Sequence, residues 1–256
     1  VVFALLGADA SAPRVDAPAV LPLEEAFAPL APPTTPATVT TTTVTHASAL
    51  ALFVRIKCSC FATFAYGYFQ ASVVLFLPLY LIERKGISRE QTILVPAFFA
   101  AGMLLFSNAA GRIGDRLGHL LVMRVLAFVG MWMITGFVFL GSYPAMCGAV
   151  FVAGATLASI SPVSLALQGV VVPPGELGRS NSIYNVFYAA GMLLGPPISS
   201  ALYTWSGGPA MLEHLAGLFL VFVLFTWVFK NDDPAARKGR AAAELASAGS
   251  AERTAV

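Results

Sequence analysis

A ten-residue patch, GRIGDRLGHL at 111–120, places charge between two apolar runs of the chain. Its distinctive members are two glycines and three charged residues: Gly111, Arg112, Asp115, Arg116 and Gly118. Glycines permit a tight turn and a close approach of helices. A carboxylate can bind the positive N-terminus of a facing helix, and an arginine can hold a loop by charge-assisted hydrogen bonds. The pattern therefore favours a turn that makes specific polar contacts over a simple solvated turn.

Polar side chains inside the apolar runs are the second set of candidates. Those that share helix faces at spacings of three or four residues are Tyr66, Gln70, Ser161, Ser164, Asn185 and Tyr188. They could line a polar path through the protein. They could equally form hydrogen bonds that only join helices, worth on average about 0.6 kcal/mol each. The second interpretation is favoured for Asn108, Gln168 and Asn181, near the run ends.

Catalytic and metal-binding patterns are missing from the sequence. It has no HExxH motif, no pair of aspartates within an apolar run and no Ser/His arrangement at membrane depth. Cys58 and Cys60 form a CxC pair without further ligands, and Cys147 stands alone. Glu213 and His214 are expected at the outer end of the last run, where the membrane interface can solvate them. We therefore expect no enzyme, catalytic residue, metal, cofactor or nucleic-acid partner.

Composition determines the protein class. Hydrophobic residues make up 57% of the 256 residues and charged residues 11%, with a mean hydropathy of +0.78. Soluble domains carry about 25% charged residues. A bilayer excludes charge from the protein surface, so the composition predicts an integral membrane protein.

Six apolar runs must hold these residues in place. Each is long enough, at about 1.5 Å per residue, to cross a hydrocarbon core of about 30 Å. Such segments are helical in lipid, because every backbone group needs an internal partner. The fold class is therefore all-α, with six transmembrane helices. They are predicted at about 59–82, 92–110, 120–141, 145–168, 182–204 and 209–229.

Basic residues near the run ends predict the orientation. Ten lie on the side that would carry both termini and three on the other, so both termini are expected in the cytoplasm. The first group is Arg55, Lys57, Arg112, Arg116, Arg124, Arg179, Lys230, Arg237, Lys238 and Arg240. The second is Arg84, Lys85 and Arg89. The patch at 111–120 then faces the cytoplasm between the second and third helices.

The patch resembles a motif of the major facilitator superfamily of secondary transporters. Gly111-x-Ile113-x-Asp115-Arg116-x-Gly118 is similar to G-x-L-x-D-R/K-x-G-R/K-R/K, which joins the second and third helices of each six-helix half. His119 and Leu120 stand where the family usually has two basic residues. The resemblance implies a conformational latch, whose contacts form in one transport state and break in the other.

Two further stretches carry the resemblance. GMLLGPPISS at 191–200 resembles the Gly-Pro motif of antiporter-type members, although that motif belongs to the first half of the family. Gly191, Gly195 and Pro196 could act in gating or in ordinary packing by small residues. ELGRSNSIYN at 176–185 is similar to the E-x-x-G-R loop before the penultimate helix.

The resemblance covers about residues 50–230 and only the second, C-terminal half of the family. It implies that 1–6 is the end of a truncated upstream helix and 7–49 a flexible cytoplasmic linker. Residues 50–230 would be the six-helix domain and 231–256 a disordered cytoplasmic tail. The partners would be a small-molecule substrate, the lipid bilayer and a missing N-terminal six-helix half.

The implied function is secondary active transport by alternating access, in a plasma or bacterial inner membrane. The GMLLGP stretch and the lack of charged residues within the spans slightly favour efflux or antiport of apolar cargo. The alternative is a half-size or inactive relative with a regulatory or dimerising role.

Overall fold

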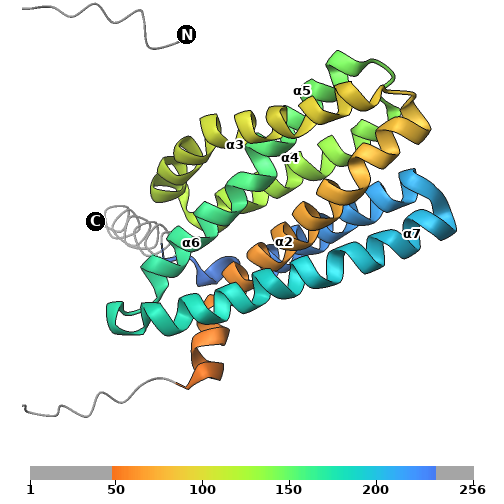
Figure 1. Cartoon of the computed structure of the whole chain (residues 1–256). Coiled ribbons are helices and arrows are strands. Elements are labelled where there is room, and N and C mark those ends of the chain that lie inside the picture. The colour runs from red at the N-terminus through yellow and green to blue at the C-terminus, as the bar shows by residue number, and fades with distance from the viewer. Residues whose placement is uncertain (1–47, 235–256) are drawn as a thin grey trace, which may run out of the picture. The chain divides into compact units, whose positions relative to one another are not determined.

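The structure, a computed structural model, describes residues 48–234, and every regular element in that range is a helix (Figure 1). Five of these helices are long and apolar enough to cross a membrane. The predicted all-α membrane fold is therefore confirmed. The predicted upstream helix at 1–6, nearly all of the linker at 7–49 and most of the tail at 231–256 lie outside the described residues.

Helix α2 (Ala49–Lys85) extends beyond the predicted span 59–82 at both ends. The Ser48 hydroxyl caps its start by accepting a hydrogen bond from the Ala51 amide at 3.1 Å. Gly86, with φ 64°, ends it in the left-handed conformation that glycine adopts readily. Helix α3 (Arg89–Leu117) begins at once, behind a capping box of Ser88 and Gln91.

A single residue, Gly118, separates α3 from α4 (His119–Phe139). The fourth span is α5 (Tyr143–Ala153), a π-helical turn at Gly154–Ala158 and α6 (Ser159–Val171), in one continuous helix. Pro162 has no N–H to donate to the carbonyl four residues earlier, where the π-helical turn ends. The sequence predicted the span but not its π-helical turn.

Helix α7 (Leu177–Val228) contains both remaining predicted spans. Gly207 interrupts it with φ 85° and ψ 176°, and the chain turns back there, from the cyan to the blue ribbon of Figure 1. The five helices thus provide six membrane-length segments, as predicted. We call the two parts of α7 its first segment, before Gly207, and its final segment, after it.

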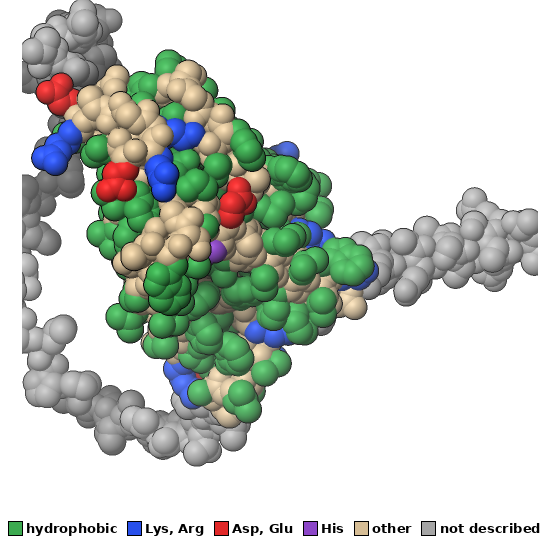
Figure 2. All heavy atoms as spheres, turned by 90° about the vertical axis from the view of Figure 1, so that its right-hand side faces the viewer, with side chains coloured by type: hydrophobic (Ala, Val, Ile, Leu, Met, Phe, Trp, Pro, Cys, Tyr) green, Lys and Arg blue, Asp and Glu red, His purple; other side chains and the backbone are tan. Residues whose placement is uncertain are grey.

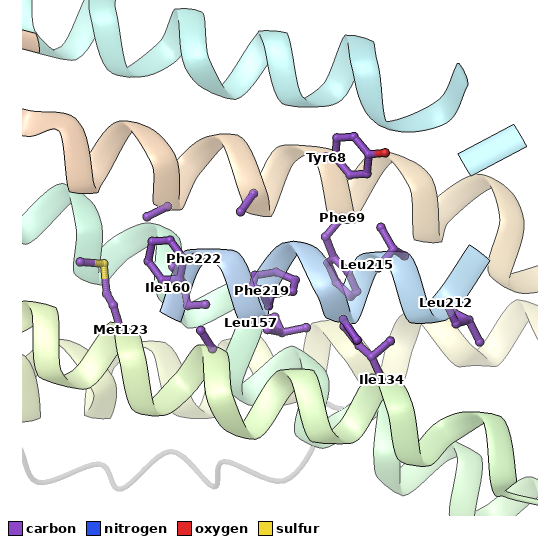
Figure 3. Packing of buried hydrophobic residues seen from close by; sticks show 14 of the residues in the cluster. Tyr68, Phe69, Met123, Ile134, Leu157, Ile160, Leu212, Leu215, Phe219 and Phe222 are labelled. Atoms are coloured by element: carbon purple, nitrogen blue, oxygen red, sulfur yellow. The ribbon is translucent and has the colours of Figure 1, made fainter. Parts of the chain in front are cut away.

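The final segment of α7 forms the centre of the core. Figure 3 shows Leu215, Phe219 and Phe222 between α2 and α4, the helices on which α7 mainly packs. They meet other buried side chains from α4, the π-helical turn and α6: Met123, Ile134, Leu157 and Ile160. With no strong hydrophobic drive inside lipid, such van der Waals packing holds the helices together.

The outer surface is largely apolar. Exposed examples lie on three different helices: Leu104 of α3, Phe139 of α4 and Leu193 of α7. Figure 2 views the end of the domain where α2 ends and α3 begins, and there side chains of both charges lie among hydrophobic ones. Apolar sides with charged ends suit a bilayer and its two interfaces.

Candidate functional site

The predicted latch patch is the end of a helix rather than an extended loop. Gly111, Arg112, Asp115 and Arg116 lie on the last two turns of α3, with all three charged side chains exposed. Gly118 has φ 99°, which lets the chain pass directly into α4. Gly118 therefore allows the tight turn that was predicted from the sequence.

His119 takes a packing role in this turn. Its ring is buried, and its Nε2 lies 3.3 Å from Asp115 Oδ1. A Cβ atom at Gly114 would lie 3.1 Å from the ring, so the missing side chain leaves room for it. The histidine that departs from the family pattern thus fills a space under α3. The Asp115 side chain itself remains 69% exposed.

A carboxylate does bind a helix N-terminus here, but it belongs to Asp233. The Leu120 amide, in the first turn of α4, donates to Asp233 Oδ2 at 2.9 Å. Amides in the first turn have no partner within the helix, and the helix dipole favours an anion there. Asp233 is only 2% exposed. The sequence did not predict this contact for Asp233, which follows the last apolar run.

The neighbouring Asp232 pairs with the ammonium of Lys57 on α2. The same ammonium lies 4.4 Å from the centre of the Phe229 ring. We call Asp232, Asp233 and their partners Lys57 and Leu120 the C-terminal clasp. The tail predicted at 231–256 begins at these residues, whose two carboxylates contact α2 and α4.

Three predicted path residues come together between α2 and the first segment of α7. The Tyr188 hydroxyl donates to Gln70 Oε1 at 2.7 Å. The rings of Tyr66 and Tyr188 stack with centroids 6.3 Å apart and planes 20° from parallel. Tyr66 is buried, whereas Gln70 and Tyr188 are half-buried and reach the surface of the domain.

Ser161 and Ser164 of α6 both contact Tyr184, a residue that was not predicted from the sequence. Its hydroxyl lies 3.1 Å from Ser161 Oγ and 3.0 Å from Ser164 Oγ. Ser59 of α2 adds a hydrogen bond of 2.9 Å to the Ser164 carbonyl. Tyr184 and Tyr188 are one turn apart on α7, so the spacing could have pointed to Tyr184.

These residues form one polar strip along α2, α6 and the first segment of α7. We call it the polar seam: Tyr66, Gln70, Ser161, Ser164, Tyr184 and Tyr188. The remaining predicted path residue, Asn185, is exposed. Hydroxyls and one amide supply its polar atoms, so it can exchange hydrogen bonds with an uncharged molecule.

Gly191 and Gly195 let α7 lie directly on α2. A Cβ at Gly195 would lie 2.5 Å from the Tyr68 carbonyl oxygen and 2.8 Å from Ser72 Oγ. A Cβ at Gly191 would overlap the Phe64 carbonyl oxygen. Pro196 follows within the helix. Small residues at this spacing allow close backbone approach in membranes. Any larger side chain would push these two helices apart.

Metal binding finds no support in the described part of the chain. Residues 48–234 hold no group of three or more His, Cys, Asp or Glu side chains that could ligate an ion. Cys58, Cys60 and Cys147 are free and buried.

Six apolar helical segments with a polar seam between them define a polytopic α-helical membrane protein. Residues 59–255 match the family model of the Major Facilitator Superfamily, and the chain belongs to that family. The resemblance stated from the sequence is therefore confirmed.

The matches to individual relatives cover only part of the length of each relative. The MFS-type transporter YcaD of Shigella flexneri, described as uncharacterized, is 30% identical over 158 residues, 62% of this chain and 40% of that protein. The YcaD protein of Escherichia coli strain K12 / DH10B is 29% identical with the same coverage. The chain thus spans about 40% of the length of these curated relatives.

A solved structure shares the fold. The POT family transporter PepTSo superposes with a TM-score of 0.62 over 70% of this chain and 38% of that one. At 15% sequence identity, this similarity supports the fold only.

Proposed function

We propose that this six-helix domain is half of a secondary transporter that carries a small molecule across a membrane by alternating access. Membership of the Major Facilitator Superfamily supports this function. The chain covers 40% of the length of its curated relatives, which is consistent with a domain that works beside a second one of similar size.

The hydrogen bond between Tyr188 and Gln70 is the observation that carries the proposal. Polar groups at membrane depth are unfavourable unless they face the protein interior or a water-filled cavity. Both side chains reach the surface of this domain, and lipid would leave their remaining hydrogen-bonding capacity unsatisfied. We assign this surface to the cavity between two domains. The uncharged seam suits an apolar or weakly polar cargo, as in efflux or antiport.

The patch at the end of α3 fits the latch role. Asp115 is exposed, so its carboxylate is available to a helix of the second domain. Such a contact, formed in one state and broken in the other, would bias the equilibrium between inward- and outward-facing forms.

Thiol labelling tests the cavity without knowledge of the substrate. In a background where Cys58, Cys60 and Cys147 are replaced by alanine, Gln70→Cys should react with a water-soluble maleimide in the membrane-embedded protein. Ser72→Cys, at a buried position on the same helix, should not react. Neither should Val125→Cys, exposed on α4, which contributes nothing to the seam. Protection of Gln70→Cys equal to that of Val125→Cys would assign this surface to lipid and contradict the proposal.

The orientation can be tested with the same chemistry. We infer from the excess of basic residues that the Gly118 end of the domain is cytoplasmic. Asp115→Cys should then react with a membrane-impermeant maleimide in inside-out vesicles and not in intact cells. Arg89→Cys, at the opposite end, should show the reverse. Labelling of Asp115→Cys in intact cells would reverse the assignment.

A further inference from the structure

An apolar groove lies between α3, α4 and the fourth span, and none of its residues belongs to the polar seam. We call it the α3–α4 groove. Its open volume is about 440 Å³, within the range of ligand pockets. The one hydroxyl in its wall, that of Thr156, donates to the Val152 carbonyl oxygen at 2.7 Å. All other side chains in the wall are apolar, so the groove suits an apolar occupant.

The groove covers about half of the membrane thickness. Its α3 wall runs from Phe106 to Leu117, the last residue of that helix. At about 1.5 Å per residue this is roughly 16 Å, about half of a hydrocarbon core of about 30 Å. At the deep end the rings of Phe106 and Phe151 meet edge-on, with centroids 6.0 Å apart. An acyl chain from the leaflet at the Gly118 end crosses the same depth.

The groove is open along its side in the part of the chain that the structure describes. Ile113, Leu121 and Val125 in its wall are between 45% and 53% exposed. A chain lying in the groove would contact three helical segments at once, and such van der Waals contacts are individually small but add up. The groove would therefore hold an acyl chain more firmly than a convex helix surface does.

Two arginines lie at the end of the groove nearest the membrane surface. Arg116 follows Ile113 by three residues and immediately precedes Leu117, and Arg112 lies one turn earlier on the same flank of α3. Both side chains are exposed, and neither forms an ion pair within residues 48–234. The carboxylate between them, Asp115, contacts His119 instead. The two guanidinium groups are therefore available to a phosphate.

We propose that the α3–α4 groove binds an anionic phospholipid, with one acyl chain in the groove and the phosphate at Arg112 and Arg116. Basic residues at a membrane surface attract anionic headgroups. A zwitterionic lipid also carries a phosphate, but its headgroup cation would lie near two arginines and weaken the contact. The site uses neither the polar seam nor a second domain, so it does not rest on the proposed transport function.

A fluorophore in the groove measures its occupancy by lipid. In the background where Cys58, Cys60 and Cys147 are replaced by alanine, Val125→Cys of the full chain is labelled with bimane in detergent and reconstituted into phosphatidylcholine nanodiscs. The nanodiscs contain a rising mole fraction of phosphatidylglycerol or phosphatidylcholine with a nitroxide on the acyl chain. Half-maximal quenching should need about fivefold less of the phosphatidylglycerol, the factor expected from about one basic residue near an anionic headgroup.

Charge variants test the headgroup contact. The double variant Arg112→Gln/Arg116→Gln should remove the preference for phosphatidylglycerol and leave quenching by phosphatidylcholine unchanged. Both side chains are exposed, so the fold should tolerate the change. Arg55→Gln is the control, because it removes an exposed arginine of α2 at the same end of the domain, outside the groove. It should keep the preference.

Ala109→Phe tests the position of the acyl chain. Ala109 is exposed in the wall of the groove, so the added ring should fill part of the space and reduce quenching by both lipids. If labelled Val125→Cys does not fold, Leu121→Cys reports on the same groove.

Three results would overturn the proposal. Equal half-maxima for the two lipids would make the groove a site for any lipid chain. A preference that survives in the folded double variant would remove the arginines from the site. Absence of quenching by either lipid would mean that protein covers the groove. None of these measurements involves transport, so they can fail while the transport proposal stands.

Discussion

The two ends of α4 are capped by charges that the helix does not itself carry. Its first turn has no acidic residue and its last turn no basic one. At the N-terminus, the Asp233 carboxylate accepts from the Leu120 amide. At the other end, the Lys85 ammonium donates to the carbonyls of Val138 and Leu140, both at 2.7 Å. Each charge is opposite in sign to the partial charge of the helix end that it contacts, and therefore stabilises it.

The two caps differ in how far they are removed from water. Asp233 is 2% exposed, whereas Lys85 is half-buried near the end of the bundle. When a buried hydrogen-bond partner is removed, the group that it satisfied stays unpaired, because water reaches it poorly. Removal of a partner at a water-accessible site is less unfavourable, since water can take its place. The comparison predicts that α4 depends more on its N-terminal cap.

Asp233→Ala should have the largest effect on stability. It removes both a side-chain cap and an anion at the positive end of α4, together worth about 2 kcal/mol of unfolding free energy. Unfolding of the purified protein by SDS in mixed micelles measures the loss. Asp233→Asn keeps an acceptor oxygen and should lose about half as much. Wild-type stability of Asp233→Ala would show that the clasp is dispensable.

Lys85→Met should destabilise less, by about 1 kcal/mol, because interfacial water can replace the ammonium at the two carbonyls. The same unfolding measurement applies. Lys85→Arg keeps the charge and is the control. The two caps lie a whole helix apart, so Lys85→Met and Asp233→Ala should be additive to within about 0.5 kcal/mol. A larger loss for Lys85→Met than for Asp233→Ala would reverse the comparison.

Lys57→Met removes the partner of Asp232 and leaves that of Asp233 in place, so it tests the two carboxylates of the clasp separately. Lys57 pairs with Asp232, and both side chains are partly exposed. Such pairs contribute about 0.5 kcal/mol, less than the buried cap next to it. A double-mutant cycle with Asp232→Asn isolates the pair, and Lys57→Arg is the control. If the coupling energy exceeded the whole loss in Asp233→Ala, the clasp would depend on Asp232.

Hydropathy located the six spans because lipid imposes length and apolar character on each one. It predicted a helix shorter than α2 at both ends, since the caps Ser48 and Gly86 lie outside the apolar run. It could not show the π-helical turn at Gly154–Ala158, which is a local change in backbone hydrogen bonding within an apolar helix.

The candidate site was partly predictable for a similar reason. Helical spacing grouped residues on one face, and it found Tyr66, Gln70 and Tyr188. Which helices meet across that face is decided by packing of distant segments, so Tyr184 was missed, and His214, which is half-buried, was expected to be solvated. Asp233 was missed because it follows the last apolar run, where composition resembles that of a solvated tail.

Asp115→Asn should change stability least. Asp115 is a carboxylate at the same end of the domain as Asp233, yet it is 69% exposed and contacts His119 rather than an α4 amide. The unfolding free energy should change by less than about 0.5 kcal/mol. Turnover should fall in the complete transporter if the carboxylate contacts the second domain, with membrane insertion unchanged. Asp115→Glu keeps the charge and should retain part of the activity. A stability loss equal to that of Asp233→Ala would mean that both carboxylates hold the turn at Gly118. Unchanged transport would leave Asp115 as part of a simple turn.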